Sequence, residues 1–302
     1  MEGLTINMKI VITGSSGFIA KNLIVNLKNK KNIELVLLTR NSNSAFFTDY
    51  SINSLVKLIE GADCIIHLAA KRFTQSSFAE VSKNAFLTER IIDAGIICNV
   101  SKIINISSIS VYSDQHVLPW KETQVVKPKN YYGLSKYTSE EISRLMIGKA
   151  STILYNLRLA HVFGANEQNN YMINLFLRQA HLGKTLNVNA VQGKREFIYV
   201  RDITSAIEAC IFDTSNDAAL TLNIGSGESL SNLEVANIIS NVFGVSEPII
   251  LNQLPDKTQD SSYMDSSLAL EKIGFKSKYS FKEAIEEIRL SMGDLENVQE
   301  FV

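Results

Sequence analysis

The sequence predicts an α/β protein built on a doubly wound parallel sheet, with a smaller mixed α/β lobe in its C-terminal part. Three observations support this fold class: strands that are apolar throughout, helices that alternate with them, and a loss of the regular alternation after about Gly164. Strands without a polar face are expected where helices cover both faces of a parallel sheet. Ligands of such a sheet bind at the carboxyl ends of its strands.

The N-terminal half supplies five apolar strands and the helices between them. Amphipathic periodicity and glycine turns set their limits. The expected strands are Lys9–Thr13, Leu35–Leu38, Cys64–Leu68, Lys102–Ser107 and Thr152–Leu157, and the expected helices begin at Phe18 or cover Ile52–Ile59, Phe86–Ile97 and Tyr132–Ile147.

The C-terminal part is less regular. It has expected helices at Met172–Leu182, Ile203–Phe212 and Leu233–Val242, and expected strands at Thr185–Val188 and Leu220–Ile224. We assign residues 8–164 to the sheet domain and residues 165–302 mainly to a second lobe, with residues 196–226 returning to the sheet. No linker separates the parts, so we expect them to pack around a cleft.

Composition and charge favour a small-molecule partner. The 302 residues are 45% hydrophobic and 20% charged, as in ordinary globular proteins. The 30 basic and 31 acidic residues form no long run of either sign. We therefore expect no nucleic-acid partner and no membrane surface.

The cysteines and the apolar segments favour a cytoplasmic protein without a metal site. Cys64, Cys98 and Cys210 are odd in number and lack metal-like spacing, so we expect buried free thiols in a reducing compartment. No apolar segment reaches the roughly 18–20 residues of a membrane helix, and no secretion signal opens the chain. Whether residues 1–7 are native stays open.

A glycine loop lies between the first strand and the first helix, in the run from Thr13 to Ala20. Gly14 and Gly17 let a pyrophosphate approach the backbone, and the helix N-terminus offers free N–H groups. Glycine is common before helices, but this position at the start of an alternating α/β pattern favours a dinucleotide. The cofactor-binding residues expected here are Gly14, Ser16, Gly17, Phe18 and Ile19.

The end of the second strand bears on the choice between NAD and NADP. It reads Leu38-Thr39-Arg40 and has no carboxylate to bind the ribose 2′-hydroxyl of NAD. The Arg40 guanidinium suits the 2′-phosphate of NADP. An arginine at a strand end is also common on plain surfaces, so NAD and NADP both stay open.

Tyr132 and Lys136 lie on one face of a helix, because they are four residues apart. An ammonium group and a cationic nicotinamide beside a phenol stabilise the phenolate, which can take a proton from a sugar hydroxyl during hydride transfer. Ser107 and Ser108 leave an apolar strand at the ligand edge, where a hydroxyl can bind the reacting oxygen. Each pattern alone is common, so their order along the chain gives them weight.

Five motifs occur in the order seen in extended short-chain dehydrogenases/reductases: Thr13–Ala20, His67–Ala70, Ser107–Tyr112, Tyr132–Lys136 and Arg195–Asp202. From about Met8 to the C-terminal helix, the chain resembles NAD-dependent epimerases/dehydratases of nucleotide sugars, which have a Rossmann-type fold. The resemblance implies that Ser108, Tyr132 and Lys136 are catalytic and that Tyr132 and Lys136 also contact the cofactor. It further implies cofactor contacts for Arg40, Asp49, Leu68, Ala69, Ala70 and Asn84.

The same resemblance implies a nucleotide-sugar site. The implied residues are Ser108, Ser110, His161, Asn170, Asn187, Arg195 and Lys257. Arg195 would clamp the diphosphate with its bidentate guanidinium. Two positions depart from the family pattern, because His161 stands where relatives often have asparagine and Lys257 stands where they often have a second arginine. A lysine would act there as a point charge only.

The preferred activity is a 4-epimerase for a UDP-hexose or UDP-N-acetylhexosamine. The run Arg195-Glu-Phe-Ile-Tyr199 resembles UDP-N-acetylglucosamine 4-epimerases, whereas Arg40 favours the alternative, an NADPH-dependent reductase of a 4-keto nucleotide sugar. A 4,6-dehydratase would need an acidic pair directly after Ser108, where Ile109 and Ser110 stand.

A non-catalytic NADP-binding protein is a further alternative of a different class. Such proteins typically lack the tyrosine or the lysine, and this chain has both Tyr132 and Lys136. The sugar, its nucleotide base and the oligomeric state stay open. Relatives often form homodimers through helices that correspond to Phe86–Ile97 and Tyr132–Ile147.

Overall fold

The structure is a computed structural model of the chain. It describes residues 7–71, 77–113, 115–148, 150–167, 169–190, 193–215, 217–253 and 261–292.

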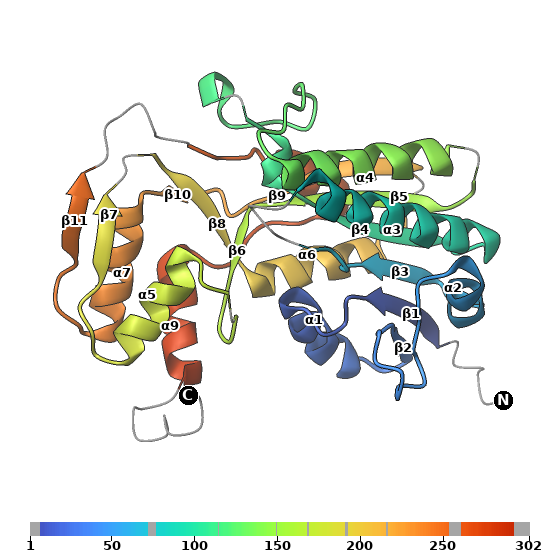
Figure 1. The fold of residues 1–302 in the computed structure, drawn as a ribbon, viewed down its shortest axis with the longest axis horizontal. Helices are drawn as coiled ribbons and strands as arrows, with labels where there is room; N and C mark the ends of the chain where they lie inside the picture. The colour runs from blue at the N-terminus through green and yellow to red at the C-terminus, as the bar shows by residue number, and fades with distance from the viewer. Residues whose placement is uncertain are drawn as a thin grey trace.

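A six-stranded parallel sheet forms the larger part of the molecule (Figure 1). Its strands are β1 (Met8–Thr13), β2 (Ile33–Leu37), β3 (Cys64–His67), β4 (Lys102–Ser108), β5 (Ile153–Leu159) and β9 (Ala219–Ile224). They lie in the order β2-β1-β3-β4-β5-β9, and every neighbouring pair is parallel. The direction of winding reverses between β1 and β3, which is where doubly wound sheets bind ligands. The predicted fold class is therefore confirmed.

Helices cover both faces of this sheet, with α3 and α4 on one side and α1 and α6 on the other (Figure 1). The helices are α1 (Phe18–Lys28), α2 (Ile52–Ile59), α3 (Phe78–Ile97), α4 (Tyr131–Ile147), α6 (Val200–Phe212) and α8 (Ser267–Ile273). Neighbouring strand residues point to opposite faces. Val11 belongs to the core beneath α2, α3 and α4, whereas Ile10 and Ile12 belong to the core beneath α1 and α6. Both sets must be apolar, which explains why successive residues at the centre of β1 are all apolar.

A second, smaller lobe lies beside the large sheet (Figure 1). It contains the sheet β10-β8-β6, the pair β11-β7 and the helices α5, α7 and α9. The bounds are β6 (His161–Phe163), α5 (Met172–His181), β7 (Asn187–Ala190), β8 (Arg195–Tyr199), β10 (Ser229–Leu230), α7 (Asn232–Phe243), β11 (Ile249–Gln253) and α9 (Phe281–Met292). The lobe has its own hydrophobic core, which includes Phe163, Phe176 and Ile285.

Residues 196–226 contribute to both parts. β9 pairs with β5 at the edge of the large sheet, whereas β8 pairs with β6 and β10 in the smaller lobe. The boundary near residue 164 stays a prediction.

From the sequence we expect neither a membrane-spanning helix nor a metal site. Across residues 7–292, apart from the gaps given above, no helix is both long and apolar enough to cross a bilayer. The same residues contain no group of three or more His, Cys, Asp or Glu side chains that could hold a metal ion.

Candidate active site

The glycine loop touches the segment that follows β3. Gly14 has a positive φ of 67°, and a Cβ at this position would lie 2.8 Å from the backbone N and Cα of Ala69. The Gly17 amide donates to the Gly14 carbonyl oxygen at 2.9 Å and precedes the first residue of α1. A side chain at Gly14 would therefore both strain the loop and fill the space at the switch point. This narrow backbone cradle beside a helix N-terminus fits a pyrophosphate.

The segment after β3 forms one wall of this cradle. The Ala69 amide donates to Thr13 Oγ1 at 3.1 Å. Asn84 on α3 holds Lys71 from both sides, because its Oδ1 accepts from the Lys71 amide at 2.8 Å and its Nδ2 donates to the Lys71 carbonyl oxygen at 3.0 Å. Leu68 and Ala69 are half-buried and Ala70 is exposed. Asn84 thus holds the backbone of the predicted cofactor wall.

Three side chains mark the end of the cradle near β2. Arg40 is exposed just beyond that strand. Asp49 is also exposed, and hydrogen bonds from the Ser51 hydroxyl at 2.7 Å and amide at 2.8 Å lower the pKa of its carboxyl. Tyr50 was not predicted. Burial raises the pKa of the Tyr50 phenol above its ordinary value. The charge of Arg40 and a hydrogen bond with the Gly14 backbone oppose this rise, so the phenol lies near Arg40 and Gly14.

Tyr132 and Lys136 lie at the start of α4, against the carboxyl end of β4. The helix begins after Asn130, whose side chain accepts a hydrogen bond from the Gly133 amide at 2.8 Å. Lys136 is buried, and its Nζ donates to the Ile106 carbonyl oxygen of β4 at 2.7 Å. Ser108 is the last residue of β4, and its Oγ accepts from the Ser110 amide at 3.2 Å. This bond starts the 3₁₀ turn η1 (Ile109–Val111).

Direct contact joins this turn to the first turn of α4. A Cβ added to Gly133 would lie 2.1 Å from the Ser110 carbonyl oxygen. Only glycine allows this approach, so Gly133, which directly follows Tyr132, sets the distance between the helix and the serine turn. The structure therefore brings the segments of Ser108, Ser110, Tyr132 and Lys136 together.

A buried ion pair joins α4 to β5 next to this region. Arg158 on β5 donates to Glu140 on α4, with Nη2 to Oε2 at 2.7 Å and Nε to Oε1 at 3.0 Å. Both side chains are at most 5% exposed. Ser107 donates to Glu140, and Arg158 also donates to the Tyr112 hydroxyl at 2.6 Å. This pair was not predicted from the sequence, although Arg158 is the one charged residue in the otherwise uncharged strand β5.

The predicted substrate residues lie in and around the second lobe. His161 on β6 has its Nδ1 2.9 Å from the Glu196 carbonyl oxygen, and Arg195 is the first residue of β8. Asn170 precedes α5, and its side-chain oxygen accepts from Arg178 at 2.9 Å. Asn187 is exposed at the start of β7. Lys257 lies outside the described residues.

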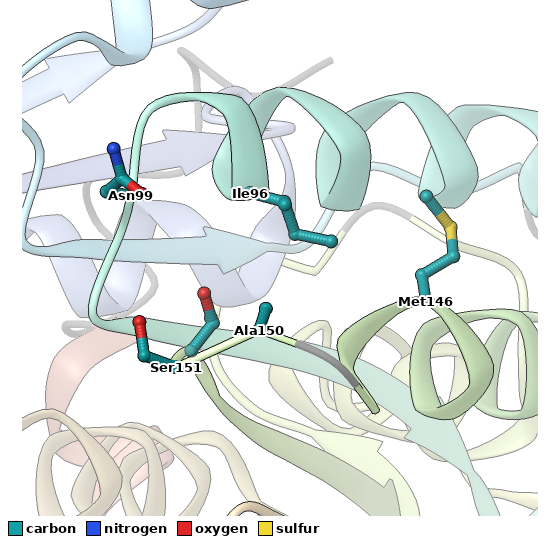
Figure 2. Close-up of a pocket in the computed structure, with 6 residues that line it drawn as sticks. Ile96, Asn99, Met146, Ala150 and Ser151 are labelled. Carbon is teal, nitrogen blue, oxygen red and sulfur yellow. The ribbon is translucent and has the colours of Figure 1, made fainter.

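A pocket of about 320 Å³ lies elsewhere (Figure 2). It is lined by Ile96, Asn99, Met146, Ala150, Ser151 and Thr152. Ile96 and Met146 lie in the last turns of α3 and α4, Asn99 follows α3, and the other three residues directly precede β5, so the pocket lies at the amino ends of the strands. Gly14, Ala69 and Ser110 follow the carboxyl ends, so the pocket is separate from the candidate site.

Comparison with known proteins decides the family. The NAD dependent epimerase/dehydratase family matches residues 10–225. The chain belongs to this family. It is therefore an NAD(P)-dependent enzyme of the family that acts on nucleotide sugars, and the Gly14 cradle fits such a cofactor.

Three relatives illustrate the likeness. The UDP-N-acetylglucosamine 4-epimerase from Bacillus cereus, which has a crystal structure, is 37% identical in sequence to this chain. The two structures match with a TM-score of 0.88 over 95% of this chain and 99% of that one. The low-salt glycan biosynthesis protein Agl12 of Haloferax volcanii is 26% identical over 92% of this chain and 96% of its own length. RMD from Pseudomonas aeruginosa, complexed with NADPH, shares the fold at 21% identity, with a TM-score of 0.81 over 93% and 97% of the two chains.

Proposed function

We propose that this family member is a 4-epimerase of a UDP-hexose or UDP-N-acetylhexosamine. The observation that carries the proposal is the contact of the Ser108 turn with the first turn of α4, at the same sheet edge as the Gly14 cradle. The likeness to the Bacillus cereus UDP-N-acetylglucosamine 4-epimerase supports the substrate class.

The proposed chemistry takes place at the C4 carbinol of the sugar. The bound nicotinamide supplies the acceptor and then the donor of the hydride. Ser108 Oγ binds the C4 oxygen, and the Tyr132 phenolate takes the hydroxyl proton as the C4 hydride leaves. Lys136 stabilises the phenolate with its positive charge. Once the 4-keto sugar has rotated in the site, Tyr132 would return its proton to the C4 oxygen, and the opposite face of C4 would receive the hydride.

The residues after Ser108 support epimerisation without loss of water. Elimination requires an additional acid and base. Ile109 is 4% exposed and belongs to the hydrophobic core, and Ser110 donates its amide to Ser108. Neither position carries an ionisable group.

The second candidate is an NADPH-dependent reductase of a 4-keto nucleotide sugar, which Arg40 favours. The two activities differ in how they use the cofactor, because an epimerase regenerates it in each cycle and a reductase consumes it. We expect the denatured enzyme to release bound NAD. A preparation that releases none and turns over only with added NADPH would contradict the epimerase.

Replacing the proposed acid/base tests the mechanism. We expect Tyr132→Phe to lower turnover of a UDP-sugar by at least ~100-fold while UDP-sugar binding persists. Tyr131→Phe is a matched control, because Tyr131 is the neighbouring residue of the same turn and is 51% exposed. Full activity of the Tyr132→Phe variant would exclude the proposed mechanism.

We also propose that the chain forms a homodimer through α3 and α4. These helices pack against each other and expose Phe86 and Ile97 on α3 and Leu145 on α4. Large apolar side chains exposed on neighbouring helices are typical of association surfaces. A monomer in sedimentation velocity at micromolar concentration would contradict the dimer.

A further inference from the structure

A chain of buried hydrogen bonds runs beneath the site, from the glycine loop to the catalytic helix. Thr13, which precedes Gly14, has its Oγ1 2.8 Å from His67 Nδ1 on β3. His67 Nε2 lies 3.2 Å from Thr88 Oγ1 on α3. Thr88 Oγ1 in turn lies 3.0 Å from the Asn84 carbonyl oxygen and 3.2 Å from Ser139 Oγ on α4. Thr13, His67, Thr88 and Ser139 are all at most 4% exposed.

Both ends of this chain reach groups assigned to the site. At one end, Thr13 Oγ1 accepts from the Ala69 amide in the cofactor wall. At the other end, Ser139 donates to the Ser135 carbonyl oxygen at 2.9 Å, and Ser135 Oγ donates to the Tyr132 carbonyl oxygen at 2.8 Å. Asn84 links the two ends a second time, because its amide holds Lys71 and approaches Ser135 Oγ at 3.4 Å.

The groups at the two ends of this series of hydrogen bonds determine which hydroxyl and imidazole groups donate and which accept. Ser139 donates its proton to the Ser135 carbonyl oxygen, and the Asn84 carbonyl oxygen can only accept. The Thr88 proton therefore points towards the Asn84 carbonyl oxygen and Ser139 Oγ. Thr88 must then accept from His67, which places the imidazole proton on Nε2. His67 Nδ1 is left as an acceptor for the Thr13 hydroxyl, and Thr13 accepts from Ala69. Every hydroxyl and imidazole donor of this network has an acceptor only when His67 is neutral.

The surroundings of the ring favour the same neutral state. Burial, together with the positive charge of Lys136, lowers the pKa of His67 to about 3. A charged imidazole would donate from both nitrogens. The Thr13 hydroxyl proton would then have no acceptor among these hydrogen-bonded groups. The hydrogen-bond pattern and the burial thus agree on one tautomer.

We propose that His67 is a positioning residue, which sets the catalytic helix α4 relative to the cofactor wall through its Nε2–H tautomer. Because Thr13 and Thr88 bond to opposite sides of one rigid ring, a shift of the wall at Ala69 changes the position of α3 and α4. Cofactor binding and the reactivity of Tyr132 are therefore coupled through His67. The inference rests on the proposed role of Tyr132.

Isosteric variants separate the two sides of the ring. Thr13→Val removes the bond on the cofactor side, and we expect it to raise the Kd for NAD or NADP at least ~10-fold. Thr88→Val removes the bond on the helix side, and we expect it to lower kcat at least ~10-fold with little change in KM, because small displacements of a reacting group are costly. Thr152→Val is the matched control, since Thr152 is 3% exposed and donates to the Val100 carbonyl oxygen away from the site.

A double-mutant cycle tests whether the effects pass through His67. In the His67→Phe background, Thr88→Val should lower kcat no further, because the bond it removes is already lost. Fully additive effects, or equal effects of Thr88→Val and Thr152→Val, would show that the chain supports the core alone and would overturn the proposal. If His67→Phe does not fold, the three threonine variants decide the question.

The tautomer gives a readout independent of turnover. The chain has four histidines, so ¹⁵N spectra of the imidazoles, compared with those of His67→Gln, identify the His67 signals. We expect a neutral Nε2–H ring that does not titrate between about pH 5 and pH 8. A titrating ring or the Nδ1–H tautomer would overturn the inference even if Tyr132 proves catalytic. If Tyr132→Phe keeps full activity, the proposed function fails, while the tautomer and the Kd of Thr13→Val still test the coupling.

Discussion

Replacing Gly133 by alanine should impair catalysis through one methyl group. The new Cβ would lie 2.1 Å from the Ser110 carbonyl oxygen, 2.9 Å from the Ser110 carbonyl carbon and 3.2 Å from Pro128 Cβ. A carbon and an oxygen in contact normally stay more than 3 Å apart, so the serine turn and α4 must separate by about 1 Å. Ser108, two residues from Ser110, would move away from Tyr132.

The magnitude follows from this displacement. A 1 Å misplacement of a reacting group can cost about 100-fold in rate, which corresponds to about 2.7 kcal/mol of transition-state stabilisation. Alanine favours the helix over glycine by about 1 kcal/mol, and overpacking costs about 1–3 kcal/mol. At the upper end of this range the free energy of unfolding falls by about 2 kcal/mol, which is less than the roughly 5–15 kcal/mol of an ordinary domain, so we expect the variant to fold.

The assay is steady-state turnover of a UDP-sugar, together with cofactor titration. We expect kcat to fall about 100-fold while the Kd for the cofactor stays near that of the wild type. Gly148→Ala is the control, because Gly148 ends the same helix in a right-handed conformation and its nearest neighbours, the Arg144 and Leu145 carbonyl oxygens, are 3.7 Å from the added Cβ. A Gly133→Ala enzyme with wild-type kcat would refute the argument that this contact sets the catalytic geometry.

Three further predictions concern the cofactor and pH. Gly14→Ala should abolish cofactor binding in a fluorescence titration, whereas Gly61→Ala, with a similar φ of 70° and nothing within 4 Å of the added Cβ, should retain it; equal losses would argue against the cradle. Arg40→Ala should weaken NADP binding and leave NAD binding unchanged, and parallel losses would show that Arg40 does not read the 2′-phosphate. Because folding lowers the pKa of His67 from 6.5 to about 3, the neutral ring stabilises the fold above about pH 6.5, and this contribution is lost as the pH falls towards 3. Near pH 5 denaturant unfolding should show the wild type losing about 2 kcal/mol more stability than His67→Gln, relative to pH 7.5, and identical curves would contradict the buried neutral state.

Most of the large sheet could be predicted because its signal is local. Each strand from β1 to β5 contains a run of apolar, mostly β-branched or leucine residues, so its position can be found without knowing its neighbours. The smaller lobe gave a weaker signal. β6 and β10 have only three and two residues, and β8 carries Arg195 and the buried Glu196, so periodicity could not identify them.

The candidate site divides in the same way. Gly14, Ser108, Tyr132 and Lys136 stand in short motifs whose spacing can be read along the chain. The groups that hold these residues in place are far apart in sequence. His67 and Thr88 are 21 residues apart, and the partners Glu140 and Arg158 are 18 apart. A polar residue in an apolar strand is the one signal that marks His67 and Arg158 in advance.

By itself, the sequence determined that this protein has a doubly wound sheet with a glycine loop and a Tyr132–Lys136 pair, because helix and strand periods and the demands of a tight turn are local properties of the chain. Only the tertiary structure decided that the Ser110 carbonyl rests on Gly133 and that His67 joins Thr13 to Thr88. Such contacts depend on how strands and helices distant in sequence come together, and a side chain at Gly133 or a second proton on His67 becomes costly only once they have packed.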